Sequence, residues 1–427
     1  MCLYIRYQFQ MSMKKSVWAA ITLMMVMGTT GCGLSDKNED NDPKIVICPT
    51  GNERVDIKLT TEEAQLVNHN NDFAFNLFRA SAETGKSQIL SPLSITYALG
   101  LLNNGAAGET KTQINEVLGF KATGENGINT FCHKLLSQSP HLDMLTKVMI
   151  ANTIFVNQNY QLKDDFVNTA KQFYDATPET CDFHDGKTLG VINQWASDHT
   201  EKMIEKILDE SSFDPDAVSY LLNAIYFKGT WSKKFNADET KNETFEGSSK
   251  QIPMMHQNEE FGYTENELCQ ALCLPYGNHA YQMTILLPRE GKSIDDLLQG
   301  LTTQEWKNYQ YMNAATVDVK LPRFESETDL ELNDIMKQLG MTKAFMENAA
   351  EFPEFCNVPT FIGLMKQCAR IKLNEEGTEA AAVTAIEVAT NASAPRHVTF
   401  HANRPFLYVI SEYSTGAIFF IGQYYGD

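Results

Sequence analysis

The residues that most often carry catalysis are scattered along this sequence. A hydrolase needs a nucleophile with a base beside it, yet the 427 residues contain no Gly-x-Ser-x-Gly turn, no His-Glu-x-x-His and no Gly-x-x-x-x-Gly-Lys-Ser/Thr loop. The nine histidines stand singly between His69 and His401, and lone histidines are more often structural groups than ligands. The motifs therefore predict no enzyme, no cofactor and no metal, although a triad assembled only in space stays open.

The cysteines favour free thiols over a disulfide framework. Of the nine cysteines, Cys2 and Cys32 are expected outside the folded part, which leaves seven, an odd number without any Cys-x-x-Cys spacing. Cys269 and Cys273 are four apart, which places them on one face of a strand but too far apart to bridge each other. We expect these cysteines to be buried as small apolar residues.

Residues 375–391 combine alanines with β-branched residues and begin with Glu375-Glu376-Gly377. Gly377 and the β-branched residues work against the alternative of an alanine-rich helix. At a period of two, one face is uncharged, and it consists of Thr378, Ala380, Ala382, Thr384, Ile386, Val388 and Thr390. The opposite face carries both charges, Glu379 and Glu387. This pattern predicts a strand with one buriable face. It runs into the loop-like residues 392–396, so the segment is suited to switch between an exposed loop and an inserted strand.

The elements that would position this segment divide into early helices and late strands. Thr61-Glu62-Glu63 opens one helix, and Ser91-Pro92 opens another whose apolar residues run up to Gly105. Strand patterns cover residues 219–227, 280–287 and 317–321, and residues 406–410 and 417–421 form a hairpin. Helices gathered early and strands gathered late predict an α+β fold.

The N-terminus reads as a leader. Met13-Lys14-Lys15, an apolar run from Val17 to Met27 and an exit at Gly31-Cys32 are typical of a signal peptide over residues 1–31. Residues 1–12 have no such pattern and fit an upstream extension. The exit resembles a bacterial lipoprotein box in which Cys32 is acylated, although Thr29 stands where that box usually has Leu. Residues 32–59 are expected to be a disordered tether because their start is polar and acidic. An unmodified, soluble secreted or periplasmic protein is the alternative.

Length and charge limit the number of domains and the classes of partner that the chain can have. Residues 60–427 contain no linker or repeat and are expected to form one domain. The net charge is -19, from 35 Lys and Arg against 54 Asp and Glu. Loss of residues 1–31, which carry Arg6, Lys14 and Lys15 and no acid, makes it -22. Such an acidic chain is repelled by nucleic acid and by anionic membranes, so neither is expected as a partner.

The segment beginning Glu375-Glu376-Gly377-Thr378 closely resembles the reactive-loop hinge of inhibitory serpins. Further segments resemble serpin signatures in serpin order, namely residues 89–95, 192–195, 223–231, 321–324 and 403–407. The resemblance covers the whole body of the chain. It implies the serpin fold, in which helices pack on a large central sheet accompanied by smaller sheets and an exposed reactive-centre loop.

The resemblance also implies a mechanism. A serpin is a suicide substrate: the target protease forms an acyl-enzyme with the loop, and the cleaved loop inserts into the main sheet as an added strand and traps the protease. The hinge residues implied are Glu375, Glu376, Gly377, Thr378, Glu379, Ala380, Ala381, Ala382, Val383 and Thr384. Non-inhibitory relatives often carry bulky or charged residues here. The small, uncharged residues at Thr378 and Ala380–Ala382 therefore favour inhibition.

Counting along the loop places the reactive bond at Asn391–Ala392, with cleavage at Ala389 or Thr390 as the alternative. The small residues around this bond suit an elastase-like or subtilisin-like serine protease, and a cysteine protease is the second choice. The partner implied is one protease in a covalent 1:1 complex with a monomer. Activation by heparin is not expected of so acidic a chain.

The resemblance also assigns serpin site positions to several single residues in the body of the chain. Ser91, Ser94 and Asn223 resemble the serpin shutter, the polar cluster that governs separation of the central strands. Gln367 stands where many members have His, and its amide can still donate and accept hydrogen bonds. Trp231 resembles the aromatic residue of the breach, where insertion begins.

A serpin-fold binding protein without inhibitory activity is the alternative function. The expected location is the outer membrane through lipid on Cys32, facing the cell exterior.

Overall fold

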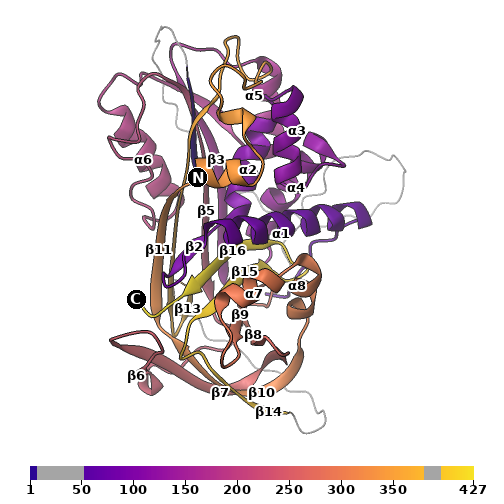
Figure 1. The fold of residues 1–427 in the computed structure, drawn as a ribbon, viewed down its shortest axis with the longest axis vertical. Helices are drawn as coiled ribbons and strands as arrows, with labels where there is room; N and C mark the ends of the chain where they lie inside the picture. The colour runs from indigo at the N-terminus through magenta and orange to yellow at the C-terminus, as the bar shows by residue number, and fades with distance from the viewer. Residues whose placement is uncertain (7–51, 379–395) are drawn as a thin grey trace, which may run out of the picture.

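Two β-sheets dominate the computed structural model, which describes residues 1–6, 52–378 and 396–427 (Figure 1). The central sheet has seven strands. Its strands are β1 (Cys2–Arg6), β3 (Thr146–Asn157), β4 (Thr177–Cys181), β5 (Ala217–Thr230), β11 (Phe324–Glu331), β12 (Ile362–Asn374) and β13 (Gly377–Thr378). The order runs β11, β12, β5, β3, β4, with β13 and β1 both lying between β12 and β5.

The second sheet has nine strands and begins and ends with distant parts of the chain. Its order is β14, β10, β7, β8, β9, β15, β16, β2, and β6 pairs with β7. The bounds are β2 (Gln88–Leu90), β6 (Lys241–Thr244), β7 (Gln251–Glu265), β8 (Cys269–Tyr276), β9 (Tyr281–Pro288), β10 (Asn313–Pro322), β14 (His397–His401), β15 (Phe406–Glu412) and β16 (Ile418–Tyr424).

Helices cover both faces of the central sheet, with α6 on one face and α2 and α4 on the other (Figure 1). The helices are α1 (Thr61–Ser81), α2 (Pro92–Asn103), α3 (Gly108–Val117), α4 (Gly124–Gln138), α5 (Asp164–Tyr174), α6 (Thr188–His199), α7 (Ile294–Gly300), α8 (Thr303–Gln310) and α9 (Asn333–Gln338). The predicted N-termini of two helices, α1 and α2, are confirmed. Thr60 and Glu63 form a reciprocal capping box, and Ser91 caps α2 with Pro92 in its first turn.

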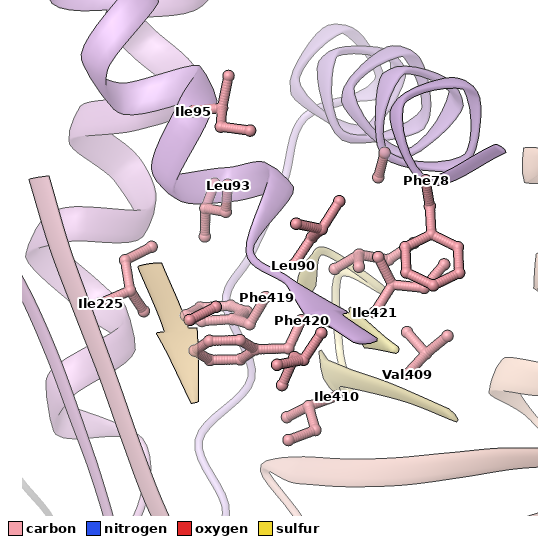
Figure 2. Close-up of a cluster of buried hydrophobic side chains, with 14 of the residues drawn as sticks. Phe78, Leu90, Leu93, Ile95, Ile225, Val409, Ile410, Phe419, Phe420 and Ile421 are labelled. Atoms are coloured by element: carbon pink, nitrogen blue, oxygen red, sulfur yellow. The ribbon is translucent and has the colours of Figure 1, made fainter. Parts of the chain in front are cut away.

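The main hydrophobic core lies where the helices meet the two sheets. Figure 2 shows Leu93 of α2 and Ile225 of β5 beside Phe419 and Phe420 of β16. All four side chains are less than a tenth exposed. A smaller cluster lies under α6 and contains Phe155, Tyr220 and Leu222 among others. The two clusters bury opposite faces of β5, so this strand is apolar along nearly its whole length rather than alternating.

The predicted strands and hairpin are present as β5, β9, β10, β15 and β16, which cover the predicted ranges except for Ala280 and Ala417. The half of the chain expected to be helical also contains β2, β3 and β4. β3 was missed because it pairs with β5 over eleven residues and is held by that partner rather than by a strong local pattern.

The N-terminal expectations need two corrections. Residues 1–31 were expected outside the fold, but Met1–Arg6 lies in the central sheet, and Cys2 is fully buried there. Residues 32–59 were expected to be a disordered tether. Of these, 32–51 lie outside the described residues, but Ile57 is buried, its N–H donates to Ser414 Oγ at 2.9 Å, and Arg54 lies over the Tyr413 ring. The body thus begins several residues earlier than predicted.

Candidate functional site

The short strand β13 marks one end of the site. Gly377 pairs with Thr230 of β5 and Asn374 of β12, and Thr378 pairs with Gly229 and Leu373. Two residues of the hinge, Gly377 and Thr378, therefore already lie between the two central strands. The backbones of β13 and β5 approach each other very closely at Gly377. A Cβ on Gly377, whose φ is +150°, would lie 2.0 Å from the carbonyl oxygen of Gly229. Only glycine fits this position without a backbone shift.

Aromatic side chains hold Thr378 in place. Trp231 stacks on Tyr276 with ring centroids 4.4 Å apart, and its indole Nε1 donates to the carbonyl of Asn374 at 3.0 Å. The hydroxyls of Tyr276 and Thr378 are 2.6 Å apart, and both residues are buried. Burial raises the pKa of Tyr276 well above its ordinary value, so this hydroxyl stays neutral and available for hydrogen bonding.

Two ion pairs anchor the residues before β13. Glu375 accepts from Thr240 Oγ1 at 2.6 Å and pairs with Arg323, while Glu376 pairs with Lys234 Nζ at 2.5 Å. Burial alone would raise the pKa of Glu375, but the hydrogen bonds from Arg323 and Thr240 outweigh it and hold the pKa below its usual value. The entry of the hinge into the sheet is therefore fixed on a charged framework at neutral pH.

A polar cluster lies deeper in the sheet. We define it as Ser91, Ser94, Asn152, Asn223 and Gln367, all less than a tenth exposed. Gln367 exchanges two hydrogen bonds with the backbone of Ser91, at 2.8 and 3.1 Å. The Ser94 hydroxyl donates to Asn223 Oδ1, and Asn223 Nδ2 donates to Asn152 Oδ1 at 2.9 Å. The structure thus brings together all four residues expected beneath the opening point.

An open space separates β13 from this polar cluster. We call it the slot, meaning the space between residues 223–228 of β5 and 367–372 of β12. A pocket lies there, bounded by Thr378 at one end and by Met1 at the other. Its walls include Ile225 and Phe227 of β5 and Ala369 and Ile371 of β12. Two neighbouring strands with an unfilled stretch between them can accept a further strand through their free backbone groups.

Within residues 1–6, 52–378 and 396–427, no cluster of three or more His, Cys, Asp or Glu could hold a metal, and no helix is long and apolar enough to cross a membrane. The histidines His256 and His401 both contact the Asp318 carboxylate through Nε2, at 2.7 and 3.0 Å.

The described cysteines are free thiols, as predicted, namely Cys2, Cys132, Cys181, Cys269, Cys273, Cys356 and Cys368. Three of them, Cys181, Cys273 and Cys368, are only partly buried. Burial raises the pKa of Cys273 and of Cys368 to about 12 in each case, so neither is a reactive thiolate at neutral pH. Cys48 and Cys32 lie outside the described residues.

Comparison with known proteins decides the family. The model of the family "Serpin (serine protease inhibitor)" matches residues 68–426. The chain belongs to the serpin family. Human Serpin B3 is 31% identical over 380 residues, which cover 83% of this chain and 97% of that protein. An uncharacterized serpin-like protein of Thermococcus kodakarensis is also 31% identical, over 87% of this chain and 88% of the relative.

Solved serpin structures have the same fold. The thermophilic serpin tengpin in its native state matches with a TM-score of 0.77 at 28% identity, over 87% of this chain and 95% of that one. A complex of thyroxine-binding globulin with thyroxine matches with a TM-score of 0.74 at 25% identity, over 85% of this chain and 99% of that one. The predicted α+β serpin fold is confirmed.

The serpin site residues fall into three groups, namely the hinge residues at β13, the polar cluster, and the residues that lie outside the described part of the chain. The described hinge residues lie at the Thr378 end of the slot together with Trp231, and they are Glu375, Glu376, Gly377 and Thr378. Residues 379–384 of the hinge and the expected cleavage positions Ala389, Thr390, Asn391 and Ala392 lie outside the described residues. The contacts that sequence reasoning missed are those of Tyr276, Thr240, Arg323 and Asn152, because each meets its partner across a long separation in the chain.

Proposed function

We propose that this serpin inhibits serine proteases as a suicide substrate, by covalent acyl-enzyme trapping followed by insertion of the cleaved loop into the slot. The observation that carries the proposal is the placement of Gly377 and Thr378 between β5 and β12, with an open cavity directly beyond Thr378. A loop that enters the sheet at this point needs no rearrangement of Gly377 or Thr378. Insertion then continues an existing strand rather than nucleating a new one.

The register supports this reading. From Thr378 the loop would run antiparallel to β5 and β12, so Ala380 and Ala382 would lie on the same face as Thr378. These uncharged residues match the apolar lining that Ile225, Phe227 and Ala369 contribute. A charged or bulky residue on this face would oppose entry because it would have to be buried without a partner.

The loop sequence suggests the target class. The residues around Asn391–Ala392 are small and uncharged, so an elastase-like or subtilisin-like protease is the proposed target, and a cysteine protease is the second choice. Cleavage at Ala389 or Thr390 is the alternative to cleavage at Asn391. The proposed product is a covalent 1:1 complex formed by a monomer, with no cofactor.

The proposed location follows from the leader. The chain is secreted across the inner membrane and held at the outer membrane by lipid on Cys32, facing outward. A soluble periplasmic or extracellular protein is the alternative. Detergent-phase partitioning of the wild-type chain against a Cys32→Ser variant separates these cases.

A serpin-fold binding protein without inhibitory activity is the second candidate, favoured by the match to thyroxine-binding globulin in complex with thyroxine. The test incubates the protein with elastase, subtilisin, trypsin and papain, followed by denaturing electrophoresis. Inhibition predicts a complex that survives SDS with the first or second protease, together with stoichiometric loss of protease activity. Loop cleavage by every protease without a stable complex would refute inhibition and favour the binding protein.

A further inference from the structure

The first six residues occupy the same strand position as the reactive loop. β1 lies antiparallel between β5 and β12, with Cys2 opposite Leu222 on one side and Lys366 on the other. β13 lies between the same two strands and runs in the same direction. The chain start, marked N in Figure 1, lies at the central sheet. Two segments from distant parts of the chain thus share one strand path.

Their registers coincide. Thr378 pairs with Gly229, and Leu222 lies seven residues before Gly229 along β5. On β12, Lys366 likewise lies seven residues before Leu373, the other partner of Thr378. Seven residues beyond Thr378 is Ala385. A loop inserted without a bulge would therefore place Ala385 where Cys2 now lies, and the two strands give the same answer independently.

The side-chain patterns of the two segments also coincide. Met1, Leu3 and Ile5 are buried in the main core, whereas Cys2 is buried in the cluster under α6. If the loop inserted in this register, Thr384, Ile386 and Val388 would take the positions that face the main core, and Ala385 the position that faces α6. Both segments thus carry apolar or uncharged residues toward the core at alternate positions, as one sheet position requires.

Hydrogen bonds fix the start of β1 at the polar cluster. The amino group of Met1 donates to the carbonyl of Asn223 at 2.8 Å, and the N–H of Asn223 donates to the carbonyl of Met1 at 3.0 Å. Asn223 is the residue whose side chain bonds Ser94 and Asn152. Among the described residues, β1 thus occupies the strand path on the far side of the slot from β13, and the slot lies between Met1 and Thr378.

We propose that Met1–Arg6 is an intramolecular competitor that occupies the loop's insertion register and blocks the sheet until it is displaced or removed. The blocking role rests on the proposed function, because it assumes that insertion of the cleaved loop traps the protease. Insertion past Val383 requires β1 to leave, since two strands cannot share one register. Removal of residues 1–31 with the leader would clear the whole path, so processing of the N-terminus activates the inhibitor.

The thiol of Cys2 reports this exchange in the wild-type full-length chain. In the intact protein Cys2 is fully buried, so a maleimide should modify it slowly. After any protease cuts the loop, insertion should expel β1 and raise the labelling rate of Cys2 at least about tenfold, because exposure governs thiol reaction. Fast labelling of Cys2 before the cut, or an unchanged rate after it, would overturn the proposal.

A cross-link measures the register itself. Because Met1 and Asn223 exchange both backbone hydrogen bonds, Cys2 and Leu222 form the closer, non-hydrogen-bonded pair, whose spacing suits a disulfide. Leu222→Cys should bond to Cys2 upon oxidation in the intact full-length chain and fail to do so after loop cleavage. Leu221→Cys is the matched control, since its side chain lies on the opposite face and should give no bond. Equal bonding by both variants, or bonding that persists after cleavage, contradicts the inference.

Inhibition gives a separate readout. Leu3→Asp, which places a charge in the main core, should release β1 and speed covalent complex formation by at least about tenfold, whereas Leu3→Met should leave it unchanged. An unchanged rate in Leu3→Asp would show that β1 does not block insertion. If neither wild type nor variant forms a complex while the Cys2 readouts behave as expected, the inhibitor function fails, and the competition between the two strands stands.

Discussion

Thr378 offers the sharpest test of how the loop enters the sheet. Its side chain is 3% exposed and lies within hydrogen-bonding distance of the buried Tyr276 hydroxyl. In the intact chain, arginine at this position would keep residue 378 out of the sheet, because entry would bury a guanidinium there without a carboxylate partner. Insertion after cleavage would then have to overcome that burial cost. The effective cost of burying an unpaired ion is several kcal/mol. If about 3 kcal/mol of that cost is present in the transition state for insertion, strand entry slows roughly 150-fold, because each 1.4 kcal/mol added to the activation free energy lowers the rate tenfold.

The outcome of protease attack depends on a race between insertion and hydrolysis of the acyl-enzyme. Slower insertion lets hydrolysis win, so Thr378→Arg should be cut as a substrate with little stable complex. The assay titrates subtilisin or elastase with increasing protein and measures the moles needed to abolish activity. After removal of residues 1–31, wild type should need about one mole per mole of protease, whereas Thr378→Arg in the same shortened chain should need at least about tenfold more.

Thr378→Val is the matched control, because it keeps the shape of the side chain and removes only the contact with Tyr276. It should remain an inhibitor with a stoichiometry close to that of wild type. If Thr378→Arg traps protease as efficiently as Thr378→Val does, the hinge does not enter the sheet at Thr378 and the reasoning is refuted.

Three further predictions concern the native fold. Asn223→Ala leaves the Ser94 hydroxyl without its acceptor, so it should lower stability by about 1–3 kcal/mol and the melting temperature with it, while a wild-type melting temperature would contradict the role of the cluster. Gly377→Ala should cost at least about 1–3 kcal/mol through backbone strain and the clash with Gly229, measured by denaturant unfolding; an unchanged midpoint would refute the close approach. The pKa of Glu375 is depressed below 4.5, so its contribution is full above that pH and is lost as the pH falls through the lower folded value. Wild type should therefore lose more stability than Glu375→Gln between pH 5 and 3, and parallel pH profiles would count against the anchor.

Local sequence patterns predicted the elements whose signals are short in range. The caps at Thr60 and Ser91 and the alternation in the C-terminal hairpin depend on neighbours within a few residues, and all are present. The period-two pattern of residues 375–391 predicted strand structure, and its described part contains the strand Gly377–Thr378. These features need no knowledge of the remainder of the fold.

The contacts that complete the site could not be predicted from local patterns. Tyr276 meets Thr378 across 102 residues, and Asn223 meets Ser94 across 129. Such pairs are fixed only once the strand order is known. The family resemblance supplied Ser94 and Asn223, but nothing in the sequence pointed to Tyr276.

The N-terminal strand was missed for a different reason. Met1, Leu3 and Ile5 alternate with Cys2 in a way that suits a buried strand. Five residues are too short for such a pattern to specify structure alone, and the strand exists because β5 and β12 offer free backbone groups on both sides.

The most direct test of the central claim locates the cleaved loop in the sheet. Ala385→Cys combined with Leu222→Cys, in a chain with Cys2→Ser, places one thiol pair across the predicted register. After the loop is cut, oxidation should join residues 222 and 385, identified by mass spectrometry of the peptides, whereas Ile386→Cys with Leu222→Cys should give no bond because its side chain lies on the other face. Absence of the bond between 222 and 385 in the cleaved protein, or an equal yield with residue 386, would show that the loop does not insert as the added strand between β5 and β12.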